Sequence, residues 1–378
     1  MHLSIVVILL TAVTVRAADP ATVHLIRRAG HLPQAWYVEQ ARQWQQQLTD
    51  HPDDSRGWYS LYVARQYSGP RGRADLSPVL ESMARHVPSS WELPYLRARA
   101  ETDRQRKVAF LEQALARCGH CGEVIEDLAL ERELTSDRGG ADDLWRQLYD
   151  SAVLARGLLD YDYNLLHSVT EGAILITNGD NDTYPAWMLQ RARGVRPDVL
   201  VLNLYLADNL RPHLQKALSL HGVTIDTATL QDLPHDDRPA FLAALVETIE
   251  AVAPDTPLYL ALTLGADLRQ PLAPRLQLTG LAARVGPAGP AELRRNLEQR
   301  FRLDSLRQDW YADSHVSTRP IVRRLNGNYS YPMLALARAL DPTETEAASR
   351  WRTLALRLAR DSGDAHLVEH VQSRLGGS

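Results

Sequence analysis

The densest group of chemically active side chains lies in residues 178–182, whose sequence is Asn-Gly-Asp-Asn-Asp. An apolar run, "AILIT" (173–177), comes directly before it, and an amphipathic pattern opens behind Pro185. Carboxylate and amide oxygens suit a hard cation such as Ca²⁺ or Mg²⁺, or the hydroxyl groups of a sugar. Asp180 and Asp182 are therefore the candidate metal ligands, and a divalent cation is the only cofactor that this pattern suggests.

The alternative for this stretch is ordinary turn chemistry, since Asn, Gly and Asp are common turn residues. In that case Gly179 supplies a positive φ, Asp182 or Thr183 caps the following helix, and Pro185 fits the first helical turn. A cap needs one or two such residues, whereas the stretch holds four amide or carboxylate side chains. Both interpretations stay open at this point.

Strand-like and helical patterns alternate on both sides of the stretch. Strands are expected at 173–177, 198–207, 223–227, 257–264 and 275–285, with helices at 185–194, 211–222 and 238–253. A strand, a short helix and a second strand form a βαβ unit, which implies parallel pairing with a right-handed crossover. The sequence therefore predicts a small, doubly wound, mostly parallel α/β domain over 169–288.

Acidic residues follow three of the expected strands. Because the carboxyl ends of parallel strands meet at one edge of a sheet, these residues are expected to lie at a common edge, where ligands of such folds bind. The candidate ligand-binding residues are Asn178, Asp180, Asn181, Asp182, Asp208 and Asp267.

The segments on either side of this domain have helical patterns. Residues 18–168 show a similar layout about every 34 residues, in which a helix ends, a turn with Pro52 or Pro88 follows, and a new helix opens near a Trp or Tyr. This layout resembles degenerate tetratricopeptide repeats, which implies stacked helix pairs and a groove for a protein partner. We expect Trp36, Trp58, Trp91 and Trp145 to fill the core between helices rather than to form a ligand cage.

The predicted fold class is thus α/β plus α. A repeat domain resembling tetratricopeptide repeats precedes the α/β domain, and residues 289–378 form C-terminal helical pairs. A turn between two helices of the repeat domain contains the only cysteines, in the sequence Cys118-Gly119-His120-Cys121. We expect a small disulfide between Cys118 and Cys121, with redox activity or a metal site involving His120 as alternatives.

Residues 1–17 have the pattern of a secretory signal peptide, with an apolar run that ends in Val15-Arg16-Ala17. The run is short for a membrane span, and no other segment is long enough, so the mature chain is expected to be periplasmic or secreted without a transmembrane segment. The formal net charge is -4, and the basic residues form no run. Nucleic acid is therefore not an expected partner.

The stretch "ILITNGDNDTYPAWMLQRARGVRPDVLVLNLYL" (174–206) resembles the soluble C-terminal region of a bacterial family of multi-pass membrane proteins related to protein O-mannosyltransferases. Two weaker resemblances follow it, "LTGLAARVGP" (278–287) and "NGNYSYPMLALARAL" (326–340), and the likeness covers about 165–345. Ala283 stands where the family pattern has Tyr. The glycosyl-transfer chemistry of that family belongs to its membrane half, which this sequence lacks, so the resemblance does not imply that activity here.

The sequence has no HExxH, no GxSxG, no dinucleotide fingerprint and no P-loop. We therefore expect an exported binding or scaffolding protein that is not an enzyme. Its helical repeats would hold a protein partner, and its α/β domain would bind a cation or a small polar ligand such as a glycan. The alternative is a hydrolase or transferase acting on glycans, with Asp180 and Asp182 as metal ligands or as acid and base.

Overall fold

The computed structural model describes residues 19–28, 31–69, 75–135, 138–235, 237–307, 318–340 and 343–375. The predicted signal peptide and its cleavage site therefore lie outside the described residues. Among the helices that the structure describes, none combines the length and the apolar character needed to cross a bilayer.

The chain divides into two compact units. One consists of His31–Glu101 together with the residues up to Leu25, and the other consists of Thr102–Ser378 together with Ile26–Gly30. The helices between residue 102 and the sheet, predicted as part of the repeat domain, thus belong to the same unit as the sheet. The compact units divide near residue 101, and the domain boundary at 168 stays a prediction.

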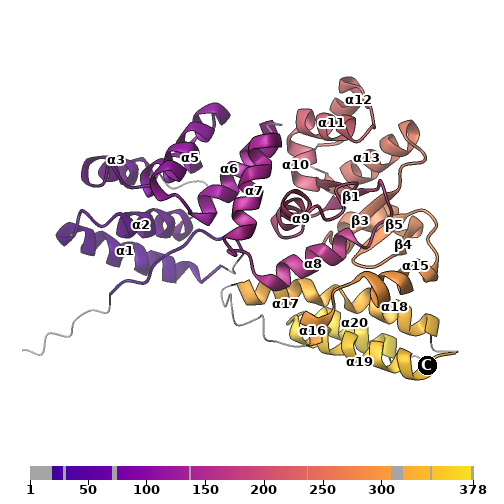
Figure 1. Ribbon diagram of the computed structural model, residues 1–378. Helices are drawn as coiled ribbons and strands as arrows, with labels where there is room; N and C mark the ends of the chain where they lie inside the picture. The colour runs from indigo at the N-terminus through magenta and orange to yellow at the C-terminus, as the bar shows by residue number, and fades with distance from the viewer. Residues whose placement is uncertain are drawn as a thin grey trace, which may run out of the picture. The chain divides into compact units, whose positions relative to one another are not determined.

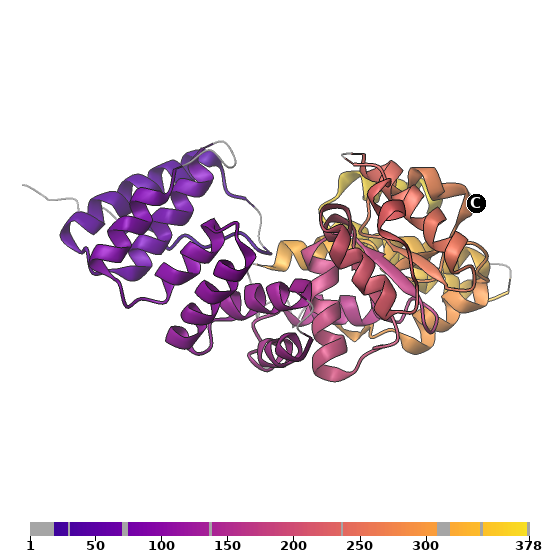
Figure 2. The ribbon, with the colours of Figure 1, turned by 90° about the horizontal axis from the view of Figure 1, so that it is seen from above.

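The smaller unit is built from two helix pairs, and Figure 2 shows its indigo to purple helices side by side. Its elements are α1 (Gln34–Asp50), α2 (Ser55–Ser68), α3 (Ser77–His86) and α4 (Glu92–Ala100). Pro52 and Pro88 lie in the turns within the two pairs, as the sequence predicts. Trp58 is buried, and its indole nitrogen donates to the carbonyl of Pro52 at 2.8 Å. This tryptophan is therefore a core residue that also fastens the turn.

Four further helices precede the sheet in the larger unit, namely α5 (Arg104–Cys118), α6 (Gly122–Thr135), α7 (Arg138–Asp150) and α8 (Arg156–Leu166). α6 packs against α5 and α7, while α7 and α8 each pack against the helix that follows the first strand. The Cys-Gly-His-Cys segment forms the turn between α5 and α6, as predicted. Gly119 has a φ of 73°, which a glycine adopts without strain. Cys118 and Cys121 are not joined by a disulfide in the structure, so the disulfide stays a prediction for an oxidising compartment.

The sheet has five strands in the order β2-β1-β3-β5-β4. They are β1 (Ile174–Thr177), β2 (Leu200–Asn203), β3 (Leu258–Ala261), β4 (Leu276–Leu278) and β5 (Ala282–Val285). β1 lies between β2 and β3 and is parallel to both, which confirms the predicted pairing of the first two strands. β5 is antiparallel to β3 and to β4, so the sheet is mixed and not mostly parallel.

Side chains of successive strand residues point to opposite faces, because the strand period is two. Leu175, Val201 and Tyr259 belong to a core shared with α8 and with α9 (Asp180–Arg193). Ile176 and Leu202 belong to a second core with α11 (Arg211–Leu220) and α13 (Arg238–Val252). Figure 1 shows α11 and α13 on one side of the strands and α8 on the other. The sheet is therefore covered on both faces, as the doubly wound prediction requires.

The remaining elements complete the larger unit. After β2 come α10 (Leu204–Asn209) and α12 (Thr227–Gln231), and after β3 come α14 (Ala266–Arg269) and a 3₁₀ helix (Gln270–Arg275). The helical C-terminal region contains α15 (Pro290–Arg295), a π-helical turn (Asn296–Arg300), α16 (Asp304–Arg307), α17 (Arg319–Gly327), α18 (Ser330–Leu340), α19 (Thr345–Asp361) and α20 (Ala365–Leu375). Residues from α18, α19 and α20 join the core on the α8 face of the sheet.

Three strand predictions are wrong in detail. Residues 223–227 form no strand, because Val223 and Ile225 are buried in the second core while their backbone crosses outside the sheet. Residues 275–285 form a hairpin of two short strands and not one strand. The strand predicted at 198–207 stops at Asn203, whose side chain accepts a hydrogen bond from Leu206 N at 3.0 Å and so caps α10.

The outer side of the edge strand β2 is closed by side chains of α9. The Trp187 indole nitrogen donates to the carbonyl of Val201 at 3.2 Å, and Gln190 Nε2 donates to the carbonyl of Val199 at 2.8 Å. Unpaired edge carbonyls are a template for pairing with another strand, so these two bonds protect the sheet. They also fix α9, and with it the polar stretch at its start.

We predict that Trp187→Phe lowers the free energy of unfolding by about 1–3 kcal/mol, because the Val201 carbonyl loses its protein donor. Urea unfolding followed by circular dichroism measures the change. Trp351→Phe is the matched control, since the Trp351 indole makes no hydrogen bond with the described residues. An equal loss in both variants would show that only ring volume matters.

Candidate functional site

The carboxyl ends of the three parallel strands lie at one edge of the sheet, as predicted. Side chains link these ends directly. The hydroxyls of Thr177 and Thr183 lie 2.7 Å apart, and Asn203 Nδ2 donates to the Thr183 hydroxyl at 3.0 Å. The end of β1 is thus joined to the end of β2 by buried hydrogen bonds.

Asp182 joins the same edge to the loop after β3. Its carboxylate is buried and accepts hydrogen bonds from the backbone N–H groups of Asn178 and Gly179, each at 2.8 Å, and from the Thr263 hydroxyl. Burial raises the pKa of Asp182, while the Thr263 hydroxyl and the two N–H groups act in the opposite direction. Asp182 caps the loop and pins it to β3, so turn chemistry accounts for this residue.

The rest of the polar stretch differs from the prediction in two respects. α9 begins at Asp180, so three of the five residues are already helical, and Pro185 lies inside the helix rather than at its start. Gly179 is extended, with a φ of -163°, and does not supply a positive φ. Asn178 is half-buried, and its backbone nitrogen is held by Asp182.

The side chains of Asp180 and Asn181 make fewer hydrogen bonds with the described residues than the side chain of Asp182 does. Asp180 is exposed to solvent, yet the protein atoms around it raise its pKa, and a hydrogen bond from Tyr184 opposes that rise. Arg28 and Glu126, which form a buried ion pair with contacts of 2.5 and 2.8 Å, add opposing fields at Asp180. The side-chain oxygen of Asn181 is buried and has no hydrogen-bond partner among the described residues.

The structure does not bring the other two predicted residues into this group. Asp208 is buried on α10 and pairs with Arg211 at 3.2 Å and with Arg238 at 4.0 Å. These guanidinium groups also lie over the rings of Phe241 and Tyr205. Asp208 is therefore part of a structural ion-pair network beside α10 and α13.

Asp267 is exposed in the first turn of α14, and no described contact joins its carboxylate to the polar stretch. In the described part of the chain, no three His, Cys, Asp or Glu side chains gather in a way that could hold a metal ion. The geometry of Asp180 and Asp182 thus gives no support to the predicted cation.

Sequence reasoning missed the most unusual residue of this edge, Asp162 on α8. Its side chain is fully buried, and neither carboxylate oxygen has a hydrogen-bond partner among the described residues. Burial raises the pKa of Asp162 well above its ordinary value, the Asp182 carboxylate raises it further, and Arg28 lowers it. Burial therefore favours the protonated form of Asp162, and a protonated carboxyl can both donate and accept a hydrogen bond.

This raised pKa has a definite effect on stability. Because the folded-state pKa of Asp162 lies above that of the unfolded chain, the carboxyl contributes most to folding below its unfolded pKa. That contribution is lost as the pH rises through the folded-state pKa. A residue that opposes folding at neutral pH is the kind that occurs at functional sites.

Arg269 on α14 is a second residue with an unpaired buried atom near this edge. Its Nε is buried without a hydrogen-bond partner in the described structure, and burial lowers its pKa. Arg269 lies in the electrostatic field of Tyr161, which in turn lies in the fields of Asp182 and Asp162. We call Asp162, Asn181, Asp182 and Arg269 the carboxyl-edge cluster.

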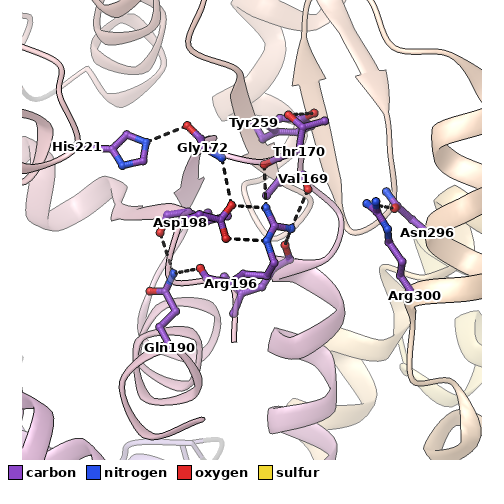
Figure 3. Close-up of polar contacts among 12 residues, drawn as sticks. Val169, Thr170, Gly172, Gln190, Arg196, Asp198, His221, Tyr259, Asn296 and Arg300 are labelled. Atoms are coloured by element: carbon purple, nitrogen blue, oxygen red, sulfur yellow. Dashed lines mark hydrogen bonds and ion pairs between the residues drawn. The ribbon is translucent and has the colours of Figure 1, made fainter. Parts of the chain in front are cut away.

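The opposite edge of the sheet is held by Arg196, which follows α9 in the sequence Arg-Pro-Asp. All five of its N–H donors are used, with Leu166, Val169 and Thr170 offering carbonyls at 2.9–3.0 Å and Asp198 a bidentate carboxylate at 2.7 and 2.9 Å (Figure 3). Arg196 adopts a φ of 45°, a strained value for a residue with a side chain. This arginine clamps the end of α8 to the starts of β1 and β2.

One known family matches this region. The family described as TMEM260-associated domain 2 matches residues 158–209, from α8 to α10, and TMEM260 is a protein O-mannosyltransferase. The match includes Asp162, residues 178–182 and Arg196, and it agrees at this coarse level with the resemblance seen in the sequence. No curated protein matches the chain.

We predict that Asp182→Asn costs about 1–3 kcal/mol of unfolding free energy, because an amide can accept only part of the three hydrogen bonds that the carboxylate accepts. The matched change Asp180→Asn should alter it by about 0.5 kcal/mol or less, since Asp180 is exposed. Chemical denaturation compares the two variants. A loss at Asp180 as large as that at Asp182 would contradict the assignment of the cap to Asp182.

Proposed function

We propose that the chain is a non-catalytic binding protein whose carboxyl-edge cluster takes a small ligand rich in hydroxyl groups, of the glycan class. One observation supports this most strongly: Asp162, Asn181 and Arg269 each carry a buried polar atom without a partner among the described residues, close to one edge of the sheet. Such atoms are rare in folded proteins, and each costs about 1–3 kcal/mol when it is left unpaired.

The unpaired groups match the chemistry of a sugar. A hydroxyl group both donates and accepts, so it can accept from a protonated Asp162 or from Arg269 and donate to Asn181. Carboxyl ends of parallel strands are also where open α/β sheets bind small ligands. Ordered water could satisfy the same atoms, and a ligand that displaces this water must reproduce its hydrogen bonds.

A divalent cation fits the cluster less well. Asp182 already accepts three hydrogen bonds, and a protonated Asp162 is a poor ligand for a hard cation. The experiment below therefore includes Ca²⁺ and Mg²⁺ only as alternative ligands.

We also propose that the helix pairs before the sheet hold a protein partner, and that the protein works in the periplasm or outside the cell. The layout of helix pairs and proline turns supports the first part, and the N-terminal sequence pattern supports the second. The resemblance to tetratricopeptide repeats belongs to this proposal.

The second candidate is an enzyme that acts on glycans. It is favoured by the raised pKa of Asp162, because glycosidases use one protonated carboxyl group as general acid. In that case the acid would be Asp162 and not Asp180 or Asp182. Release of reducing sugar from an oligosaccharide would favour the enzyme.

The proposal is tested by melting curves of the purified protein with monosaccharides, oligosaccharides, CaCl₂ and MgCl₂. We expect at least one sugar to raise the melting temperature with increasing concentration, as binding to the folded state requires. Asp162→Leu should abolish this rise, and Asp267→Leu, which changes an exposed aspartate near the same edge, should keep it. A panel without any sugar effect, or an effect that Asp162→Leu retains, would overturn the proposal, and a rise with cations alone would restore the cation interpretation.

A further inference from the structure

A cavity of about 570 Å³ lies at the opposite edge of the sheet, where β1 and β2 begin. Its wall is formed by residues 167–171 before β1, by Arg196 and Asp198 before β2, and by the segment of α15 and the following π-helical turn. Figure 3 shows Arg196 and Asp198 on one side and Arg300 with Asn296 across from them. No residue of the carboxyl-edge cluster contributes to this wall.

Three charged side chains of the wall, Arg196, Asp198 and Glu292, already form hydrogen bonds within the protein. Arg196 uses all its donors on three carbonyls and on Asp198, whose second oxygen also accepts from Gly172 N at 3.1 Å. The Tyr259 hydroxyl lies 3.1 Å from the Thr170 hydroxyl and 3.3 Å from a Glu292 oxygen. These groups shape the cavity. The charges of Arg196 and Asp198 are balanced by contacts within the protein and are not available to a ligand.

Arg295 and Arg300 are the cations that remain. Neither forms an ion pair with any described residue, although both line the cavity. Arg300 Nη1 donates to Asn296 Oδ1 at 3.1 Å, and Asn296 is fully buried, with its Nδ2 donating to the Thr279 carbonyl at 2.6 Å. The Arg300 guanidinium is therefore held in place by a buried amide, and its other N–H groups bond to no other described residue.

His167 faces the same cavity, and only one of its ring nitrogens has a hydrogen-bond partner in the described part of the chain. Its Nδ1 lies 2.8 Å from the Tyr163 carbonyl, so in the neutral ring Nδ1 carries the hydrogen and Nε2 carries a lone pair. The ring stacks on Tyr163 at 4.1 Å, and the Arg302 guanidinium lies 3.6 Å from the centre of that tyrosine ring.

The guanidinium groups near His167 make the electrostatic potential at its ring positive. Burial lowers the pKa of His167, the Tyr163 carbonyl opposes this, and Arg196, Arg300 and Arg302 lower the pKa further. Arg302 also acts on Asp160, whose nearest cation is Arg156 at 3.6 Å. Asp198 neutralises Arg196, whereas Arg300 and Arg302 form no ion pair with a described residue, so this end of the cavity favours an anion.

We propose that this cavity binds a phosphate monoester, with Arg295 and Arg300 holding the phosphate and His167, protonated in the complex, donating a hydrogen bond to it from Nε2. Planar guanidinium groups match phosphate oxygens in pairs, and a bound dianion compensates the positive field at His167. Glu171 and Glu292, the acidic residues of the wall other than Asp198, can accept hydrogen bonds from hydroxyl groups on the rest of the ester. The site is independent of the proposed sugar site at the other edge.

The test is isothermal titration of the full chain with glucose 6-phosphate and with inorganic phosphate, at ionic strength matched with chloride. We expect Arg300→Gln to weaken binding about tenfold or more, which corresponds to the loss of one charge-assisted hydrogen bond. Arg146→Gln, which removes an exposed arginine of α7 that pairs with Asp143, should bind as the wild type does. Sedimentation with phosphatidic-acid vesicles distinguishes a lipid headgroup from a soluble ester as the source of the phosphate.

Nuclear magnetic resonance of His167 gives a second readout. Phosphate should raise the pKa of His167 in the wild type, because a nearby anion stabilises the imidazolium. Arg300→Gln should raise it without any ligand, because one positive charge is removed. Equal binding by wild type, Arg300→Gln and Arg146→Gln, or no binding by the wild type together with an unchanged His167 pKa, would overturn the proposal.

Discussion

The buried carboxylate of Asp182 is the constraint on which the carboxyl edge of the sheet depends. It accepts two backbone N–H groups of its own loop and the Thr263 hydroxyl from the loop after β3. A buried charge is tolerated only where several donors surround it, and here the donors come from two segments that meet only in the folded sheet. The loop is therefore rigid, and its polarity is first of all structural.

Because Asp182 is committed in this way, the chemistry left for a ligand belongs to its neighbours. Asp162 lies close enough to feel the negative charge of Asp182, and it has no donor of its own among the described residues. The fold thus supplies three hydrogen-bond donors to one buried carboxyl and none among the described residues to the other. Arg196 has a similar structural role at the opposite edge of the sheet. Its hydrogen bonds fix the chain around a cavity, and its N–H groups are therefore not available to a ligand.

The sequence was sufficient to predict the helix pairs, the βαβ unit and the common edge of the first strands, because each of these follows from local periodicity. It was not sufficient to exclude a strand at 223–227. Val223 and Ile225 alternate with polar residues because they pack on the face of the sheet, not because they pair with a strand. The hairpin at 275–285 was missed because two short antiparallel strands read as one apolar run.

The candidate site was predicted only in part for a related reason. Residues 178–182 stand out by composition, whereas Asp162 is hidden in a helix whose apolar residues dominate the pattern. A usable indication was present, since Asp162 lies four residues after Leu158 and three before Leu165, both buried, and so shares their face of α8. Thr263 and Arg269 come from a loop about eighty residues away, and no local pattern connects them with Asp182.

The most direct test of the central claim is the pKa of Asp162 in the folded protein. It can be followed through the ¹³Cγ chemical shift of aspartate-labelled protein, with Asp162→Asn identifying the resonance. We predict that Asp162 is protonated at neutral pH and ionises well above the ordinary range of aspartate. An Asp162 that titrates at about 4, as a solvated aspartate does, would contradict a neutral, unpaired carboxyl at this edge and remove the main support for the ligand site.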